Sequence, residues 1–108
     1  MSAERRVEDF LASAGYRVVE RNFRWRGGEI DLVATDARGE LVFVEVRSAA
    51  ARSPWLRYTI SAPKRRRLVA TAQRYLLARR WARRAALRFD VVWVEAQRLE
   101  HWKNVAMV

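Results

Sequence analysis

The 108-residue sequence contains no cysteine and a single histidine, His101. These absences exclude disulfide frameworks, CxxC zinc sites, thiol nucleophiles and any site that requires two imidazoles. The longest apolar runs, such as 41–44 and 91–94, are far shorter than the roughly 20 residues that cross a bilayer. The N-terminus places arginines before an amphipathic segment and has no apolar signal core, so we expect a cytoplasmic protein with no membrane contact.

Acidic residues are absent from much of the second half of the chain, since no Asp or Glu lies between Arg47 and Asp90. Residues 1–50 hold eight basic and nine acidic side chains, whereas residues 51–108 hold fourteen basic and three acidic ones. The net charge is +10. This asymmetry favours a polyanionic partner, nucleic acid first, for the basic half and a coordinating role for the acidic half. A well-solvated basic surface is the alternative.

No internal repeat, low-complexity tract or linker is present, so we expect a single domain over residues 1–108. Helical and alternating apolar periodicities predict its elements. They are a helix capped by Ser2 and ended by Gly15, strands over 16–22, 29–35 and 40–47, a helix over 63–83, a strand over 88–95 and a short strand over 99–105. The order α-β-β-β-α-β predicts an α/β protein with a small mixed central β-sheet flanked by helices.

The second and third predicted strands are expected to form a hairpin whose turn centres on residue 38. Directly opposed residues then have numbers that sum to 76, which places Asp31 opposite Glu45 and Glu29 opposite Arg47 on one face. Cross-strand neighbours have Cβ atoms about 4.5–5.5 Å apart, where like charges are destabilising. The carboxylate pair therefore needs a compensating cation, either Arg47 or a bound metal.

Carboxylates with a nearby main-chain carbonyl form a hard oxygen ligand set that suits Mg²⁺ or Mn²⁺. We expect Asp31, Glu45 and the Val46 carbonyl to bind the metal, with Glu4 joining them from the edge of the first helix. In the alternative, the acidic pair is simply exposed on a half-hydrated sheet face. Apolar residues share the face of Glu45, which indicates that the face is partly covered and favours the site.

Four segments carry a resemblance to a known family, namely GYRVVERNFRWRGGEIDLVATD, LVFVEVR, APKRRRLVATAQRYL and RFDVVWV. They resemble the YraN-like family of uncharacterised bacterial proteins, which is similar to the Holliday junction resolvase branch of the PD-(D/E)XK nuclease superfamily. The resemblance implies a restriction-endonuclease-like fold and Mg²⁺-dependent cleavage of DNA phosphodiesters. It also implies that Asp31 is the metal-binding Asp, Glu45 the acid of the ExK motif, Glu4 the first-helix Glu and Glu29 the Glu of GEID.

Arg47 departs from the pattern of the family, which has lysine there. That lysine orients or activates the attacking water and offsets phosphate charge; arginine can offset charge but keeps its proton. Three interpretations follow. Arg47 acts as an electrostatic clamp in catalysis, Lys64 from the long helix replaces the lysine, or the site binds nucleic acid without cleaving it. The interpretation with Lys64 is the least favoured of the three.

Cations crowd the first turn of the predicted 63–83 helix, where the helix dipole is already positive and each exposed cation costs roughly 0.3–1 kcal/mol. A bound phosphate would offset this cost. The predicted nucleic-acid-binding residues are Lys64, Arg65, Arg66, Arg67, Arg74, Arg52 and Arg57. Trp25 and Trp55 lie beside arginines and are candidates for stacking on unpaired bases, although core or dimer contacts are the commoner role of tryptophan.

Together these features predict a nucleic-acid-binding protein that acts as a Mg²⁺-dependent endonuclease on branched or single-stranded DNA. Its catalytic residues would be Glu4, Asp31, Glu45 and Arg47. The first alternative is a module of the same fold that binds nucleic acid without hydrolysis. The second is a basic scaffold for a protein partner with an inert acidic pocket. A resolvase-like role favours a homodimer, but the sequence shows no interface.

Overall fold

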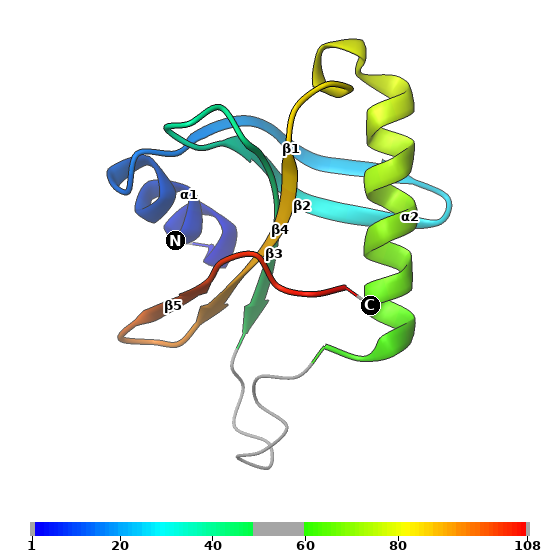
Figure 1. The fold of residues 1–108 in the computed structure, drawn as a ribbon. Coiled ribbons are helices and arrows are strands. Elements are labelled where there is room, and N and C mark those ends of the chain that lie inside the picture. Colours follow the sequence, from blue (N-terminus) through cyan, green and yellow to red (C-terminus); the bar gives the residue numbers. More distant parts are fainter. Residues whose placement is uncertain (1, 49–59, 108) are drawn as a thin grey trace.

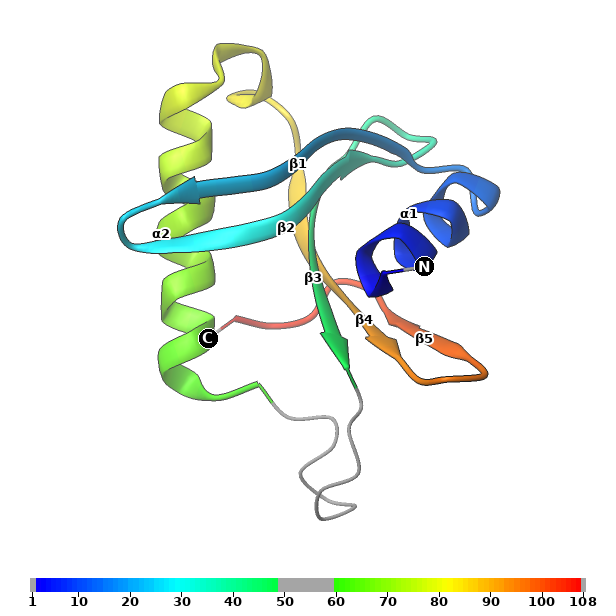
Figure 2. The same ribbon diagram turned by 180° about the vertical axis from the view of Figure 1, so that it is seen from behind.

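The computed structural model describes residues 2–48 and 60–107. Its elements are α1 (Ala3–Ser13), β1 (Arg17–Trp25), β2 (Gly28–Thr35), β3 (Leu41–Ser48), α2 (Ala62–Ala78), the 3₁₀ helix η2 (Arg80–Ala82), β4 (Leu87–Val94) and β5 (Leu99–Trp102). The strands form one sheet in the order β1-β2-β3-β4-β5, in which only β3 and β4 pair in parallel. α1 covers one face of the sheet and α2 the other (Figures 1 and 2). The predicted α/β class with a small mixed sheet is confirmed.

Both helices begin at a serine that accepts a backbone hydrogen bond. The Ser2 side chain accepts from the Arg5 amide at 3.1 Å, and Ser61 accepts from the Lys64 amide at 3.2 Å. These contacts satisfy amides that the first turn of a helix leaves without a partner. α1 ends before Gly15, whose φ of +90° lies in the left-handed region that glycine adopts without steric cost. The predicted limits of α1 are therefore confirmed.

The second helix is shorter than its apolar periodicity predicts. α2 ends at Ala78 instead of residue 83, because Arg79 is extended with a φ of −127°. The Arg79 guanidinium donates two hydrogen bonds, of 2.9 and 2.6 Å, to the Glu20 carboxylate on β1. This long-range ion pair fixes the end of α2 against the sheet, and η2 follows it.

The β1–β2 hairpin is longer than predicted, because β1 continues to Trp25 and leaves only a two-residue turn. It reaches past α2, and its tip packs against the helix (Figures 1 and 2). A Cβ atom on Gly27 would lie 2.3 Å from the Trp25 ring, and one on Gly28 would lie 2.6 Å from Thr71 Oγ1. Gly28 thus permits the close approach of the hairpin to α2, and Gly27 leaves room for the Trp25 ring.

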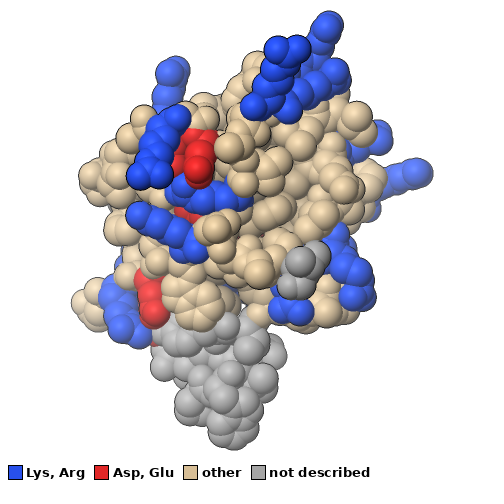
Figure 3. Space-filling model, viewed as in Figure 1, with Lys and Arg blue, Asp and Glu red and all other residues tan. Residues whose placement is uncertain are grey.

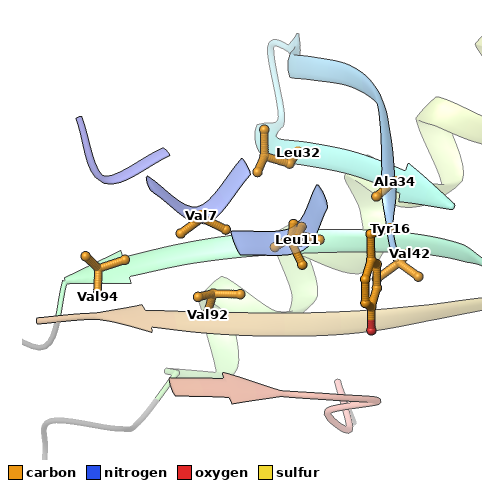
Figure 4. Packing of buried hydrophobic residues seen from close by; sticks show 9 residues of the cluster. Val7, Leu11, Tyr16, Leu32, Ala34, Val42, Val92 and Val94 are labelled. Atoms are coloured by element: carbon orange, nitrogen blue, oxygen red, sulfur yellow. The ribbon is translucent and has the colours of Figure 1, made fainter. Parts of the chain in front are cut away.

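Each face of the sheet carries its own hydrophobic cluster. Val7 and Leu11 of α1 pack on alternate residues of β2 and β3, such as Leu32 and Val42 (Figure 4). On the other face, α2 packs on the intervening residues of the same strands. This cluster includes Val33, Leu41, Phe43, Leu68, Ala72 and Tyr75. The central strands are therefore buried on both sides, as expected for a sheet between helices.

No helix in the described part of the chain is both long and apolar enough to cross a membrane.

Candidate active site

The candidate site lies where β2 and β3 stop pairing. Their ladder joins Thr35 to Leu41 at one end and Leu32 to Val44 at the other, so the predicted sum of 76 is confirmed for these pairs. At the next position the Asp31 carboxylate accepts a hydrogen bond of 2.8 Å from the Val46 amide. A side-chain oxygen thus takes the place of a backbone acceptor at the point where the strands part.

The alternation of side chains along β2 also shifts at Asp31. Ile30 packs in the cluster under α2, whereas Leu32, two residues later, packs under α1. On β1, Asn22 lies opposite this point with a φ of 53°, a left-handed conformation that asparagine tolerates better than most residues. The local irregularity places Asp31 beside acidic groups from both faces of the sheet.

Glu45 is buried, with only 5% of its surface exposed, and it faces two cations. Its Oε2 atom lies 3.2 Å from Lys64 Nζ on α2 and 3.8 Å from an Arg47 guanidinium nitrogen. Burial raises the pKa of Glu45 to about 7, helped by the charge of Asp31 and a hydrogen bond with it, and Lys64 only partly opposes this rise. Glu45 therefore keeps its proton up to near neutral pH, and this proton lies in the hydrogen bond with Asp31.

Glu4 and Glu29 complete the acidic cluster around Asp31. Burial raises the pKa of Glu4, and the charges of Asp31 and Glu29 add to the rise. Glu29 forms an ion pair with Arg24, so the predicted pairing of Glu29 with Arg47 is wrong. That pairing assumed a regular ladder beyond Asp31, and the shift at this residue turns Glu29 toward its own hairpin.

The residues fit a hard divalent cation at the Asp31–Glu45 pair. Two carboxyl groups in hydrogen-bonding contact repel each other when both are ionised, and a divalent ion would replace the shared proton. Within residues 2–48 and 60–107, no three carboxylate or imidazole groups are close enough to bind one ion together. The pair would therefore be completed by water and by main-chain oxygen, for which the Val46 carbonyl remains the prediction. Glu4 would act through the charge of Asp31.

The predicted nucleic-acid-binding residues divide into separate roles. Arg65 donates a 2.9 Å hydrogen bond to the Ile60 carbonyl, and the Arg74 guanidinium lies 5.3 Å from the centre of the Trp25 ring. Arg66 and Arg67 are exposed and line a groove beside the hairpin tip. Basic side chains also project from the surface around the C-terminal end of α2 and η2 (Figure 3). Arg52, Arg57 and Trp55 lie outside the described residues.

The Lys64 interpretation is the least favoured from the sequence, yet among the described residues its amine is the cation nearest to Glu45. The available signal was its position one helical turn before Leu68, an apolar residue of the same helix that the structure packs on the sheet. The role of Trp25 is also resolved in part. Its indole nitrogen donates a 2.9 Å hydrogen bond to Thr71 Oγ1, so the ring packs against α2.

A second buried carboxylate, Asp90 on β4, is saturated with partners. It accepts hydrogen bonds from the Arg88 guanidinium at 3.0 Å, His101 at 2.7 Å and the Asn104 amide at 3.0 Å. Burial alone would raise the pKa of Asp90, but these hydrogen bonds outweigh it and hold the pKa below its usual value. These contacts give Asp90 and His101 structural roles.

Comparison with known proteins gives consistent matches over most of the chain. The model of the uncharacterised protein family UPF0102 matches residues 3–94. A UPF0102 protein of Ralstonia pickettii is 44% identical over 107 residues, covering 95% of this chain and 85% of the relative. One from Dechloromonas aromatica is 48% identical over 104 residues, covering 94% and 82%. Among solved structures, a Silicibacter pomeroyi protein of unknown function, SPO1766, matches with a TM-score of 0.44 and 18% identity, covering 96% of this chain and 69% of its own.

Proposed function

This chain belongs to the uncharacterised protein family UPF0102, and we propose that it is a nucleic-acid-binding protein with a Mg²⁺-dependent endonuclease site. One observation carries the proposal. Asp31 and Glu45, from adjacent strands, meet where the strands part, and a lysine amine lies 3.2 Å from the second carboxylate. Carboxylates that crowd one another and share a proton, beside a cation, are typical of a metal-dependent hydrolytic site.

The described residues can divide the chemistry of phosphodiester hydrolysis among them. A divalent ion, when bound, lowers the pKa of a water ligand and offsets charge on the phosphate. The Val46 amide orients the Asp31 carboxylate through a 2.8 Å hydrogen bond, so this ligand is positioned before the ion arrives. Glu45 gives up the shared proton on binding, and Glu4 adds negative charge that favours the cation.

Lys64 can transfer a proton to or from the attacking water, which Arg47 cannot do. A guanidinium keeps its proton under all ordinary conditions, whereas a lysine amine can exchange one. Lys64 Nζ is also closer to Glu45 than the Arg47 guanidinium is, at 3.2 against 3.8 Å. We assign Lys64 to the attacking water and Arg47 to the charge of the scissile phosphate.

The test is cleavage of labelled flap, four-way-junction and single-stranded DNA with Mg²⁺ or Mn²⁺. Asp31→Asn should lower the cleavage rate at least 100-fold. Lys64→Ala should lower it more than Arg47→Ala does, and Lys103→Ala, which removes an exposed lysine outside the acidic site, should leave it unchanged. Circular dichroism confirms that each variant is folded. Full activity in Asp31→Asn would place cleavage at another site or in a contaminant.

Arginine in the motif position favours a second candidate, a module that binds nucleic acid without hydrolysing it. Such a protein would bind DNA but show no cleavage in any of these assays. If Arg47→Lys then creates cleavage in a silent protein, the native site is a degenerate nuclease site. If the wild type already cleaves, arginine is sufficient at this position. A protein scaffold with an inert acidic pocket would instead gain no thermal stability from Mg²⁺ or Mn²⁺.

A further inference from the structure

The hairpin tip and the first turns of α2 enclose a groove of about 340 Å³ beside the acidic site. Its lining combines an indole, two guanidinium groups and small or apolar residues: Trp25, Gly27, Pro63, Arg66, Arg67 and Ala70. We propose that this groove binds one nucleotide of an unpaired nucleic acid strand, with its base on the apolar wall and its phosphate on the arginines. The inference rests on the proposed function and specifies the substrate as single-stranded at this position.

The indole wall of the groove is held in place before any ligand binds. Trp25 Nε1 donates to Thr71 Oγ1 at 2.9 Å, and that hydroxyl donates in turn to the Arg67 carbonyl at 2.7 Å. Gly27 lies against the indole, and the Arg74 guanidinium lies 5.3 Å from its centre. A fixed aromatic wall reduces the entropy lost on binding, which favours a ligand with a flat apolar part.

The cations of the groove are available to a ligand. Arg66 and Arg67 are exposed, and the structure places no carboxylate of a described residue within ion-pair distance of either. The lining itself contains no acidic residue. An occupant must therefore carry negative charge as well as a flat apolar face, and a nucleotide has both. A base in a duplex is already stacked and paired, so an unpaired strand fits better than a duplex.

The groove lies next to the acidic site along α2. Lys64, which contacts Glu45, precedes Arg67 by one helical turn. Arg67 also lies against the hairpin, because a Cβ atom on Gly28 would be 3.8 Å from the Arg67 side chain. Gly28 is followed directly by Glu29, a member of the acidic cluster. A strand that places one nucleotide in the groove therefore has a neighbouring phosphate near the carboxylates.

The test measures binding of labelled oligo(dT) and of a duplex of equal length by fluorescence anisotropy in EDTA, which removes any dependence on metal. The wild type should bind oligo(dT) more tightly than the duplex. Arg66→Gln combined with Arg67→Gln should weaken oligo(dT) binding at least tenfold. It should also reduce the slope of log K against log salt by about 1.4, since each contact to a single strand contributes about 0.7.

Two further variants separate groove binding from general electrostatics. Arg80→Gln with Arg84→Gln removes the same charge from exposed residues beyond the other end of α2 and should change affinity less than twofold. Ala70→Phe fills the groove without changing charge and should weaken oligo(dT) binding while sparing the duplex. Equal losses from the two arginine pairs, tighter duplex binding by the wild type, or no effect of Ala70→Phe would overturn the proposal.

Failure of the nuclease proposal is distinguishable from failure of this one. Asp31→Asn should abolish cleavage yet retain oligo(dT) binding in EDTA, because Asp31 does not line the groove. If the wild type binds oligo(dT) through Arg66 and Arg67 but never cleaves, the groove proposal is supported and the hydrolytic proposal is contradicted. If cleavage depends on Asp31 but the groove variants bind and cleave normally, the groove is overturned and the hydrolytic site stands.

Discussion

Two buried carboxylates on neighbouring parallel strands behave in opposite ways. Glu45 on β3 is 5% exposed and Asp90 on β4 is fully buried. The two residues belong to consecutive pairs of the β3–β4 ladder, so they are close neighbours in the sheet. Glu45 faces α2 through Lys64, whereas Asp90 faces the side of α1, where His101 packs on Phe10. Both groups are buried, yet the pKa of Asp90 is lowered and the pKa of Glu45 is raised to about 7.

The difference lies in the partners rather than in burial. Asp90 accepts hydrogen bonds from the Arg88 guanidinium, the His101 ring and a backbone amide. Arg88 also forms ion pairs with Asp36 and Glu40. Glu45 has Lys64 nearby but must also tolerate Asp31, a second carboxylate. A carboxylate whose hydrogen bonds are satisfied internally is typical of a structural centre, and one crowded by a second carboxylate is typical of a binding site.

Asp90→Ala is expected to have the largest effect on stability, and it tests the structural role of the Asp90 centre. It leaves the His101 ring and the Asn104 amide without their acceptor and leaves the Arg88 guanidinium with only Asp36 and Glu40. Each donor left without a partner costs about 1–3 kcal/mol, so the free energy of unfolding should fall by about 3–5 kcal/mol. Urea denaturation measures the change. Arg98→Ala, which disrupts exposed ion pairs with Glu95 and Glu100, is the matched control and should cost less than about 1 kcal/mol. A similar cost for both variants would contradict the structural role of the Asp90 centre.

The opposite sign is expected at the other centre, where Glu45→Gln should stabilise the protein at pH 8. An acid whose pKa rises from 4.5 to about 7 on folding binds more protons in the folded state, so its ionisation opposes folding as the pH rises through this window. One pKa unit corresponds to about 1.4 kcal/mol, which sets an upper limit of about 3 kcal/mol for the gain.

The pH dependence provides the control for Glu45→Gln. Its advantage should be close to zero near pH 4.5, should grow between pH 4.5 and 7, and should stay constant above pH 7, because only the wild type titrates there. Urea denaturation of both proteins across this range gives the difference. A variant that is less stable than the wild type at pH 8 would show that the Lys64 ion pair outweighs the crowding by Asp31.

Local patterns in the sequence were sufficient to predict the fold and the carboxylate pair. Apolar periodicity located the helices and strands, and the turn at 36–39 set a register that the structure retains as far as Leu32 and Val44. Because β-strand pairing extends from its turn, this register brings Asp31 and Glu45 close together one position beyond the last pair.

The remaining features depend on contacts between distant segments, which local patterns do not encode. The alternation shifts at Asp31, opposite the left-handed Asn22, and Glu29 forms an ion pair with Arg24. Lys64 reaches Glu45 only because α2 packs across the sheet, and the end of α2 is fixed by an ion pair to Glu20 on β1. No periodicity within one element specifies such long-range pairs.

The smallest expected effect concerns divalent ions, which should stabilise only the centre in which two carboxylates crowd each other. With about 10 mM Mg²⁺ and a dissociation constant of about 1 mM, mass action predicts about 1.4 kcal/mol of stabilisation, or several degrees in Tm. Asp31→Asn should abolish this shift, whereas Glu100→Gln, an exposed carboxylate away from both centres, should retain it. Thermal melts with Mg²⁺, Mn²⁺ and Na⁺ at equal ionic strength measure it. Because bound metal displaces the proton shared with Glu45, the shift should be larger at pH 8 than at pH 6. A shift that is equal in Asp31→Asn would place the ion elsewhere and remove the physical distinction between the two carboxylate centres.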